Sequence, residues 1–381
     1  MTNEATGPAA PGRLKVLSIV GPGRSGTTIL ACVLGEVDGV VTVGELRWLW
    51  RRGVLERRPC GCGRPLDECP FWSPVLRRSL ARNGLSPAAT VSAQDEVATR
   101  RHRLRAVRSA RGTPSRWAAL RQVRHSTATL VDAVADVSRA RVVVDSSKRP
   151  QDAAVLAAAP GIDHYVLHVV RDPAAVAWSW QRGDKLVPTA EGLRPMLTRR
   201  LLGSTLRWVE NCLGAEALRR HVSPDRWLFL RYEDFVAQPR SAVDRILAFL
   251  GEDAEGPFRS EDTVELSVNH TVAGNPDRMR VGLVPISVDD EWRRRMPLRR
   301  RFAVRVRTGC SVVRRRPARS TSRGRLHASS DPPDPVPAAR EALRVPQPQV
   351  GPGRLHPEGQ GTVPAVDPHP RDGVGPDLLG P

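Results

Sequence analysis

The sequence predicts an α/β protein built on a three-layer, doubly wound parallel sheet. Five short runs, most of them rich in β-branched residues, are almost continuously apolar, as expected for strands buried on both faces. Segments of helical length separate these runs, an order that implies crossover connections and parallel pairing. The first run leads into a glycine-rich loop and then a helical pattern, an arrangement that binds anions. Ligands of such sheets bind at the carboxyl ends of the strands.

The five predicted strands are LKVLSIV at 14–20, VVTV at 40–43, ARVVVDSS at 140–147, HYVLHVV at 164–170 and RWLFLRY at 226–232. Residues 51–139 interrupt the alternation with a cysteine-bearing loop and Arg- and Ala-rich helices, so we expect an insertion or lid there. A second helical stretch is expected over about 191–222, where it could wall an acceptor cleft.

The ends of the chain differ from its middle. Residues 1–13 are expected to be a flexible N-terminus, and 14–297 one domain. After residue 297 the apolar periodicity fades, and 14 of the 34 prolines fall between Pro317 and Pro381. Such a composition cannot form a packed core, so 298–381 is predicted to be a disordered tail. It is either a genuine basic tail or the out-of-frame reading of a GC-rich gene.

The net charge of +19 suggests an anionic partner. More than half of the excess lies after residue 292, where 18 arginines face 7 acids. Because the sequence lacks the aromatic interleaving of single-strand binders, no specific nucleic-acid partner is expected. No apolar stretch is long enough to span a bilayer, and no signal peptide is recognisable, so a cytoplasmic location is predicted. The oligomeric state is not predicted.

The loop GPGRSGTTIL, residues 21–30, follows the first predicted strand. Gly23 and Gly26 permit a tight turn whose backbone N–H groups face an anion, and Ser25, Thr27 and Thr28 add hydroxyl donors. A nucleotide-binding P-loop requires lysine where Thr27 stands, and here the cation is Arg24, inside the loop. The loop therefore favours a ligand with a single phosphate over a nucleoside triphosphate.

Residues 24–28, RSGTT, resemble the 5′-phosphosulfate loop of sulfotransferases that use 3′-phosphoadenosine 5′-phosphosulfate (PAPS). HVVRDPAAVAWSW resembles the 3′-phosphate motif of that family, with Arg171 at a strand end and Ser179 eight residues later. A dianionic phosphate suits a bidentate guanidinium and a hydroxyl. The chain thus resembles the bacterial PAPS-dependent sulfotransferases over residues 14–297, which implies a P-loop-like sulfotransferase fold.

Two further segments share the resemblance. LRYEDFVAQP resembles the family segment whose tyrosine lies near adenine, which implies that role for Tyr232; a buried tyrosine with one hydrogen bond is the alternative. HTVAGNPDRMR resembles the family loop that folds over the 3′-phosphate, which implies Arg278, then Arg280, as ligands, although loop arginines are usually solvated. The implied cosubstrate is PAPS.

Sulfuryl transfer to a hydroxyl requires a base for the acceptor proton and a cation over the leaving oxygen. Glu45 follows the second predicted strand, where tyrosylprotein sulfotransferases have a glutamate base, so we predict Glu45 as the base. The alternative is that Glu45 caps the next helix. Arg24 and Lys148 are the predicted catalytic cations, although Lys148 is equally consistent with ordinary strand-end polarity. No metal is required for this reaction.

Two features stay open. Cys60, Cys62 and Cys69 lie in PCGCGRPLDECPFW, without a CxxC pair or a fourth ligand nearby, so no metal site is predicted; a metal, a disulfide and a loop with plain thiols remain alternatives. The acceptor is expected to be a small molecule, glycan or lipid. Four aromatic residues either line an apolar acceptor pocket or form a core cluster: Trp48, Trp50, Phe71 and Trp72. A small-molecule kinase and a basic nucleic-acid-binding protein are the alternative functions.

Overall fold

The computed structural model describes residues 13–112, 115–183 and 185–309, and its centre is a five-stranded sheet in the order β2-β3-β1-β4-β7. All neighbouring strands pair in parallel. The strands are β1 (Leu14–Val20), β2 (Val40–Gly44), β3 (Val142–Lys148), β4 (Ile162–Val170) and β7 (Trp227–Arg231). The predicted doubly wound parallel sheet is confirmed. Of the predicted flexible N-terminus, only residue 13 lies within the described residues.

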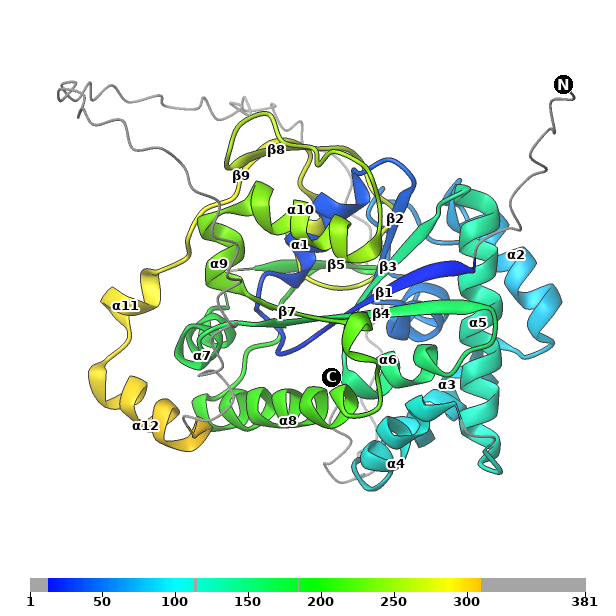
Figure 1. Cartoon of the computed structure of the whole chain (residues 1–381), viewed down its shortest axis with the longest axis horizontal. Coiled ribbons are helices and arrows are strands. Elements are labelled where there is room, and N and C mark those ends of the chain that lie inside the picture. Colours follow the sequence, from blue (N-terminus) through cyan, green and yellow to red (C-terminus); the bar gives the residue numbers. More distant parts are fainter. Residues whose placement is uncertain (1–12, 113–114, 184, 310–381) are drawn as a thin grey trace, which may run out of the picture. The chain divides into compact units, whose positions relative to one another are not determined.

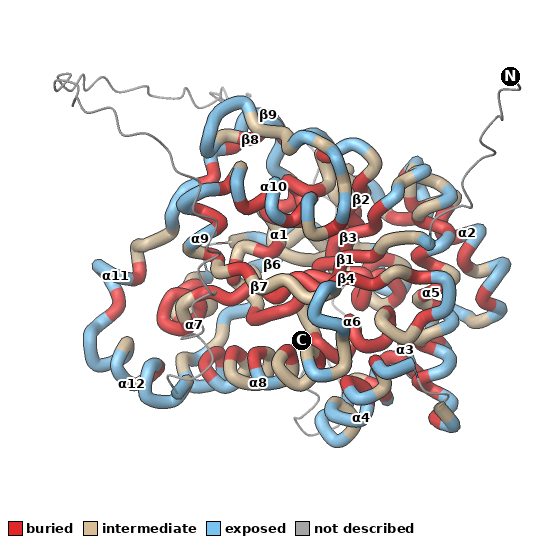
Figure 2. The backbone as a smooth tube through the Cα atoms, viewed as in Figure 1, coloured by how far each residue is buried: buried red, intermediate tan, exposed pale blue. Residues whose placement is uncertain are grey.

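Helices cover both faces of the sheet (Figure 1). Because side chains alternate along a strand, Leu17 and Ile19 of β1 join one core cluster, whereas Val16 and Val20 contact the opposite layer. The first layer contains α1 (Thr27–Gly35), α9 (Tyr232–Ala237) and α10 (Pro239–Leu250). The second contains α2 (Trp72–Asn83), α5 (Ala118–Ser138), α6 (Pro150–Ala157) and α8 (Leu201–Arg219). Figure 2 shows buried residues along the central strands.

The segment predicted as an insertion is partly core. Its helix α5 packs Leu130, Val131 and Val134 into the same cluster as the strand residues Val16 and Val143. The segment begins within η2 (Leu49–Leu55), which follows η1 (Leu46–Trp48). Besides α2 and α5 it contains elements shorter than α5: α3 (Pro87–Ala98), η3 (Arg100–His102), α4 (Arg103–Arg108) and η4 (Ser109–Arg111). Thus α5 belongs to one of the two helical layers. A lid role for the other elements of this segment stays a prediction.

The predicted helix over 191–222 is wrong at its start. An antiparallel hairpin of β5 (Leu186–Thr189) and β6 (Gly192–Pro195) follows α7 (Pro173–Gln181), and α8 begins only at Leu201. Pro188 and Pro195 restrict the backbone here and favour an extended chain over a helix. The elements that follow are η5 (Pro224–Arg226), β8 (Thr263–Leu266), η6 (Pro276–Met279) and β9 (Gly282–Pro285).

The predicted start of the tail at residue 298 is also wrong. After α11 (Glu291–Arg295), residues Leu298–Thr308 form helix α12. Val304 is 1% exposed and packs in one cluster with Trp292, Met296 and the α7 residues Ala174 and Ala177. Arginines cover much of the helix, which obscured its apolar stripe. The rest of the predicted tail, residues 310–381, lies outside the described residues. Within the described part of the chain, no helix is both long and apolar enough to cross a membrane.

Candidate functional site

The glycine-rich loop lies at the carboxyl end of β1, between β3 and β4. Gly21 has φ +138°, its N–H donates to the Lys148 carbonyl at 2.9 Å, and a Cβ there would lie 2.0 Å from the Val169 carbonyl oxygen. Gly26 has φ +73°, and a Cβ there would lie 2.6 Å from the Tyr232 ring. Only glycine therefore fits at these two positions.

The loop leads directly into helix α1. Thr27 is the first residue of α1, and Gly26 precedes it without any side-chain cap. Ser25 is 1% exposed, and its Oγ has no hydrogen-bond partner among the described residues. A buried hydroxyl without a partner beside the N-terminus of a helix is a donor suited to an anion.

Arg24, Arg171 and Ser179, three of the residues predicted to bind the cosubstrate, lie together at this loop. The Arg171 Nη1 donates to the Arg24 carbonyl at 3.2 Å, and the Arg24 Nη2 donates to the Ser179 carbonyl at 3.2 Å. The Arg171 guanidinium also lies over the Tyr232 ring, 4.4 Å from its centroid. Burial raises the pKa of the Tyr232 hydroxyl. Residues about 200 positions apart along the chain thus form one cluster.

Two acidic residues already pair with arginines at this cluster. The Arg171 Nη2 lies 3.2 Å from Asp289 Oδ2 and donates to the Asp289 carbonyl at 2.8 Å. The Asp289 carboxylate is shared with Arg182, which also pairs with Glu291. Burial favours the protonated carboxyl of Asp289, but Arg171 and Arg182 outweigh burial and lower its pKa. A phosphate on Arg171 would compete with this carboxylate.

The Arg278 guanidinium is bonded to backbone carbonyls. Arg278 is buried, and its two terminal nitrogens donate to the carbonyls of Thr271, at 2.7 Å, and Pro59, at 2.8 Å. Those bonds tie the loop after β8 to the cysteine-bearing loop. The sequence assigned Arg278 to the 3′-phosphate, but these bonds occupy its guanidinium in another place.

Glu45 and Lys148 form an ion pair at the ends of β2 and β3. Glu45 precedes η1 but makes no side-chain cap bond to it. Instead, the Asp145 carboxylate accepts from the N–H of Leu46 at 3.1 Å and from Ser147 Oγ at 2.6 Å. Burial raises the pKa of the Asp145 carboxyl to about 7. Asp145 therefore takes the capping role considered for Glu45, whose side chain points to Lys148.

The loop at residues 271–274, more than 200 positions further along the chain, covers Glu45. The Glu45 N–H donates to the Val272 carbonyl at 2.8 Å, and the Val272 N–H donates to Val43 at 3.0 Å. A Cβ on Gly274 would lie 3.3 Å from Glu45 Oε1 and 3.7 Å from Thr28 Oγ1. Thr28 and Glu45 are thus neighbours across Gly274, so the predicted base and the phosphate loop face one site.

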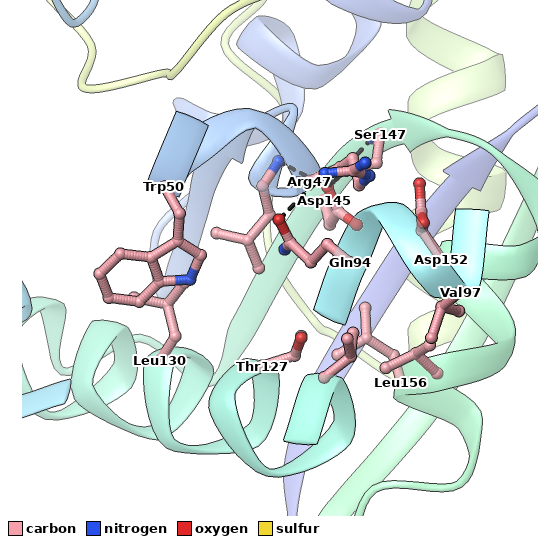
Figure 3. Close-up of a pocket in the computed structure, with 13 residues that line it drawn as sticks. Arg47, Trp50, Gln94, Val97, Thr127, Leu130, Asp145, Ser147, Asp152 and Leu156 are labelled. Carbon is pink, nitrogen blue, oxygen red and sulfur yellow. Dashed lines mark hydrogen bonds between the residues drawn. The ribbon is translucent and has the colours of Figure 1, made fainter. Parts of the chain in front are cut away.

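A pocket lies among η1, α3, α5 and α6 (Figure 3). Leu46 and Ser147, the chain neighbours of Glu45 and Lys148, belong to its lining. Arg47 lies in its polar part and donates to Gln94 at 2.9 Å. The apolar lining is Leu46, Trp50, Val97, Val123, Leu130, Val155 and Leu156. Apolar and polar residues therefore share the lining, and neither Glu45 nor Lys148 belongs to it.

The four aromatic residues after Glu45 were expected either to line an acceptor pocket or to form a core cluster, and they do not all do the same. Trp50 lines the pocket, whereas Trp72 is completely buried in the core. Phe71 stacks on His270, with ring centroids 5.2 Å apart, and Trp48 lies under the Arg52 guanidinium. A single acceptor wall of four aromatic residues is therefore not formed.

Sequence reasoning missed three residues. His270 lies beside Cys60 and Cys69, 210 and 201 positions away along the chain, and supplies the fourth ligand type that the cysteine loop lacks locally. Trp180 packs against Gly23 and holds Arg24 5.4 Å from its ring centroid. Asp289 pairs with Arg171. Of these three, only Trp180 could have been singled out from the local sequence, because it directly follows Ser179.

A glycine-rich loop, Arg24, Lys148 and Arg171 lie together at the carboxyl end of a parallel α/β sheet, where proteins of this architecture bind their ligands. Residues 17–256 match the model of the sulfotransferase family, so the chain belongs to that family and is a transferase. None of the curated proteins matches the sequence.

Solved structures similar to this chain include three bacterial proteins. The sulfotransferase domain from the Synechococcus PCC 7002 olefin synthase is 19% identical, with a TM-score of 0.43, over 79% of this chain and 97% of that one. The sulfotransferase domain from the curacin biosynthetic pathway is 17% identical, with a TM-score of 0.35, over 67% and 77%. Sulfotransferase STF9 from Mycobacterium avium is 14% identical, with a TM-score of 0.34, over 64% and 65%. Similarities of this size do not identify a substrate.

Proposed function

We propose that the protein transfers the sulfuryl group of PAPS to the hydroxyl of a small-molecule, glycan or lipid acceptor. The observation that carries the proposal is the convergence of Arg24, Ser179, Arg171 and Tyr232 on the loop at the start of α1. PAPS carries two anionic groups, and the N-terminus of α1 and the Arg171 guanidinium beside it offer donors for both. A cytoplasmic location stays a prediction.

In this proposal, the loop amides, Ser25 Oγ and Thr27 bind the 5′-phosphosulfate. The unpartnered Ser25 hydroxyl supports this assignment. Arg171 and Ser179 bind the 3′-phosphate, which displaces the Asp289 carboxylate from Arg171, and Tyr232 and Trp180 are candidates for contact with adenine. Arg278 is not part of the proposed cosubstrate site, because carbonyl oxygens occupy its guanidinium.

The transfer step follows from the placement of Glu45 and Lys148. The acceptor oxygen attacks sulfur while its proton passes to the Glu45 carboxylate, and the bond between sulfur and the bridging oxygen breaks. Before the reaction, Lys148 pairs with the Glu45 carboxylate. As negative charge develops on the leaving phosphate, Arg24 and Lys148 stabilise it, and adenosine 3′,5′-bisphosphate leaves. The residues assigned here perform the step without a metal.

The pocket beside Glu45 supports an acceptor with an apolar body. Leu46, the residue after Glu45, lines this pocket together with six other apolar residues, and the body of an acceptor could bind there. An apolar alcohol or lipid fits this lining better than a highly polar sugar.

The test compares Glu45→Gln with the surface variant Glu56→Gln, using labelled PAPS and extracts that contain candidate acceptors. We expect Glu45→Gln to lower kcat by about 100-fold or more, because general-base catalysis contributes about that much. Binding of adenosine 3′,5′-bisphosphate should be unchanged in both variants, and Glu56→Gln should retain its activity. Normal turnover by Glu45→Gln would contradict the base assignment. Turnover of ATP with magnesium, and none of PAPS, would support the kinase alternative instead.

A further inference from the structure

Three cysteines and one histidine form a compact cluster outside the proposed transfer site. Their ligand atoms, the Sγ atoms of Cys60, Cys62 and Cys69 and one ring nitrogen of His270, all lie within 4.8 Å of one another. The Sγ atoms are 3.0, 3.5 and 3.7 Å apart, and His270 Nδ1 is 3.2 Å from the Cys69 sulfur and 3.7 Å from the Cys60 sulfur. We propose that these residues bind a structural zinc ion.

The distances match the shape that zinc requires. A tetrahedral ion with Zn–S bonds of about 2.3 Å and a Zn–N bond of about 2.0 Å separates its sulfur ligands by about 3.8 Å, and sulfur from nitrogen by about 3.5 Å. The Cys60–Cys69 and Cys62–Cys69 sulfur separations of 3.5 and 3.7 Å are close to these values, and the Cys60–Cys62 separation of 3.0 Å would have to widen by about 0.8 Å. Four protein ligands leave no open position for a substrate, which is typical of structural rather than catalytic zinc. Sulfur with imidazole in a tetrahedral set favours zinc over magnesium or calcium.

The backbone of the cysteine loop supports metal binding. The Cys62 N–H points to Cys60 Sγ at 3.3 Å, and the Trp72 N–H points to Cys69 Sγ at 3.5 Å. Such N–H groups stabilise the thiolates that a metal needs. A Cβ on Gly61 would lie 2.2 Å from the Asn269 side-chain oxygen, so glycine between the first two cysteines lets the two loops approach closely.

The His270 ring is held in the orientation of a ligand. Phe71 stacks on it with an interplanar angle of 15°, and the Trp72 Nε1–H donates to the His270 carbonyl at 2.6 Å. Three thiolates with one Zn²⁺ leave one net negative charge, and the buried Arg278 supplies a positive charge where it bonds Pro59 and Thr271. Arg278, which has no place in the proposed cosubstrate site, thus acquires a role.

A disulfide does not explain the cluster. The cysteines are free, and each Sγ pair is well beyond the bond length of about 2.05 Å. A single disulfide would also leave the third sulfur and the imidazole unexplained.

The zinc would join segments that lie far apart along the chain. His270 is two residues from Val272, which pairs with Val43 and accepts from the Glu45 N–H. Linking residues 60–69 to His270 therefore anchors the loop that covers the proposed base. The ion would act by holding that loop, without contacting the substrate.

The test measures metals in the purified full-length protein, expressed with zinc, by elemental mass spectrometry. We expect one zinc ion per chain. Cys62→Ser and His270→Phe should lose it, His270→Cys should retain it because four thiolates also bind zinc, and the controls Cys32→Ser and Cys212→Ser should retain it. Zinc content does not depend on the transfer reaction, so it can fail or succeed independently of the proposed function.

A second measurement does not rely on the folding of any variant. Wild-type protein expressed with cobalt should show the intense visible absorption of tetrahedral Co²⁺ bound to thiolates, and zinc should displace it. A strong chelator should lower the melting temperature. Wild-type protein without zinc and without the cobalt spectrum would overturn the proposal. So would a disulfide among peptides containing Cys60, Cys62 and Cys69, or zinc that persists in both Cys62→Ser and His270→Phe.

Discussion

At the scale of single residues, Arg171 shows how one side chain serves both the fold and the proposed site. Its guanidinium bonds the Arg24 carbonyl, pairs with Asp289 and stacks on Tyr232. Loss of Arg171 would disturb the loop as well as the ligand. A test must therefore separate the two effects with ligands that differ only in the 3′-phosphate.

We expect Arg171→Ala to weaken the binding of adenosine 3′,5′-bisphosphate by about 10- to 100-fold, because hydrogen bonds to charged groups contribute about 1.5–3 kcal/mol. Binding of adenosine 5′-phosphate, measured in parallel by calorimetry, should change much less. Arg182→Ala removes the other arginine that pairs with Asp289 and should affect both ligands little. An equal loss for both ligands in Arg171→Ala would mean that Arg171 does not recognise the 3′-phosphate.

Single residues also show which positions of the site the sequence could predict and which it could not. Arg24, Arg171 and Ser179 were predictable because each occupies a strand end or a position at fixed spacing from one. Arg278 and His270 lie in an irregular loop, where packing against a distant segment decides the direction of each side chain. No local pattern could reveal that Arg278 bonds Pro59, 219 positions away.

At the scale of elements, the end of β2 is joined to the loop at 271–274. Gly44 pairs with Val272, and a Cβ on Gly44 would lie 2.5 Å from the Val272 carbonyl oxygen and 2.6 Å from its nitrogen. The next residue is Glu45, so the packing at Gly44 fixes the backbone that carries the proposed base.

Gly44→Ala should therefore lower the free energy of unfolding by more than the strain of a left-handed backbone alone would. A left-handed non-glycine residue costs about 1–2 kcal/mol. Gly84→Ala is a matched control, because Gly84 has φ +67° but no atom within 4 Å of a Cβ, whereas Gly44 has φ +76° and the contacts to Val272. We expect urea unfolding to show a larger loss for Gly44→Ala, which should also lower kcat. Equal stability losses in Gly44→Ala and Gly84→Ala would contradict the idea that the close approach of the Val272 backbone excludes a side chain at residue 44.

The strands were easier to predict than the helices around them. Runs such as LKVLSIV are apolar on both faces because helices cover both sides of the sheet. The hairpin at β5 and β6 carries no such run, and its residues are mostly exposed or half-buried, so its sequence resembles the polar start of a helix.

At the scale of the whole molecule, the folded part of the chain extends further than its composition suggests. Eight of the 18 arginines after residue 292 lie in or between α11 and α12, where the chain is helical, rather than beyond residue 309. A basic segment was taken for a tail because arginines outnumber its buried apolar residues. One buried valine, Val304, connects that segment to the core.

The position of this boundary can be tested by paired truncations and paired point variants. A chain ending at residue 297 loses α12 and exposes Trp292 and Met296, so it should be less stable than a chain ending at residue 309. In the full-length protein, Val304→Ala should lower the free energy of unfolding by about 1–3 kcal/mol, as core truncations do. Val306→Ala, at a position 63% exposed, should change it by less than about 0.5 kcal/mol. If both truncated chains unfold at the same urea concentration, α12 does not belong to the folded domain. If Val304→Ala and Val306→Ala behave alike, Val304 does not connect α12 to the core.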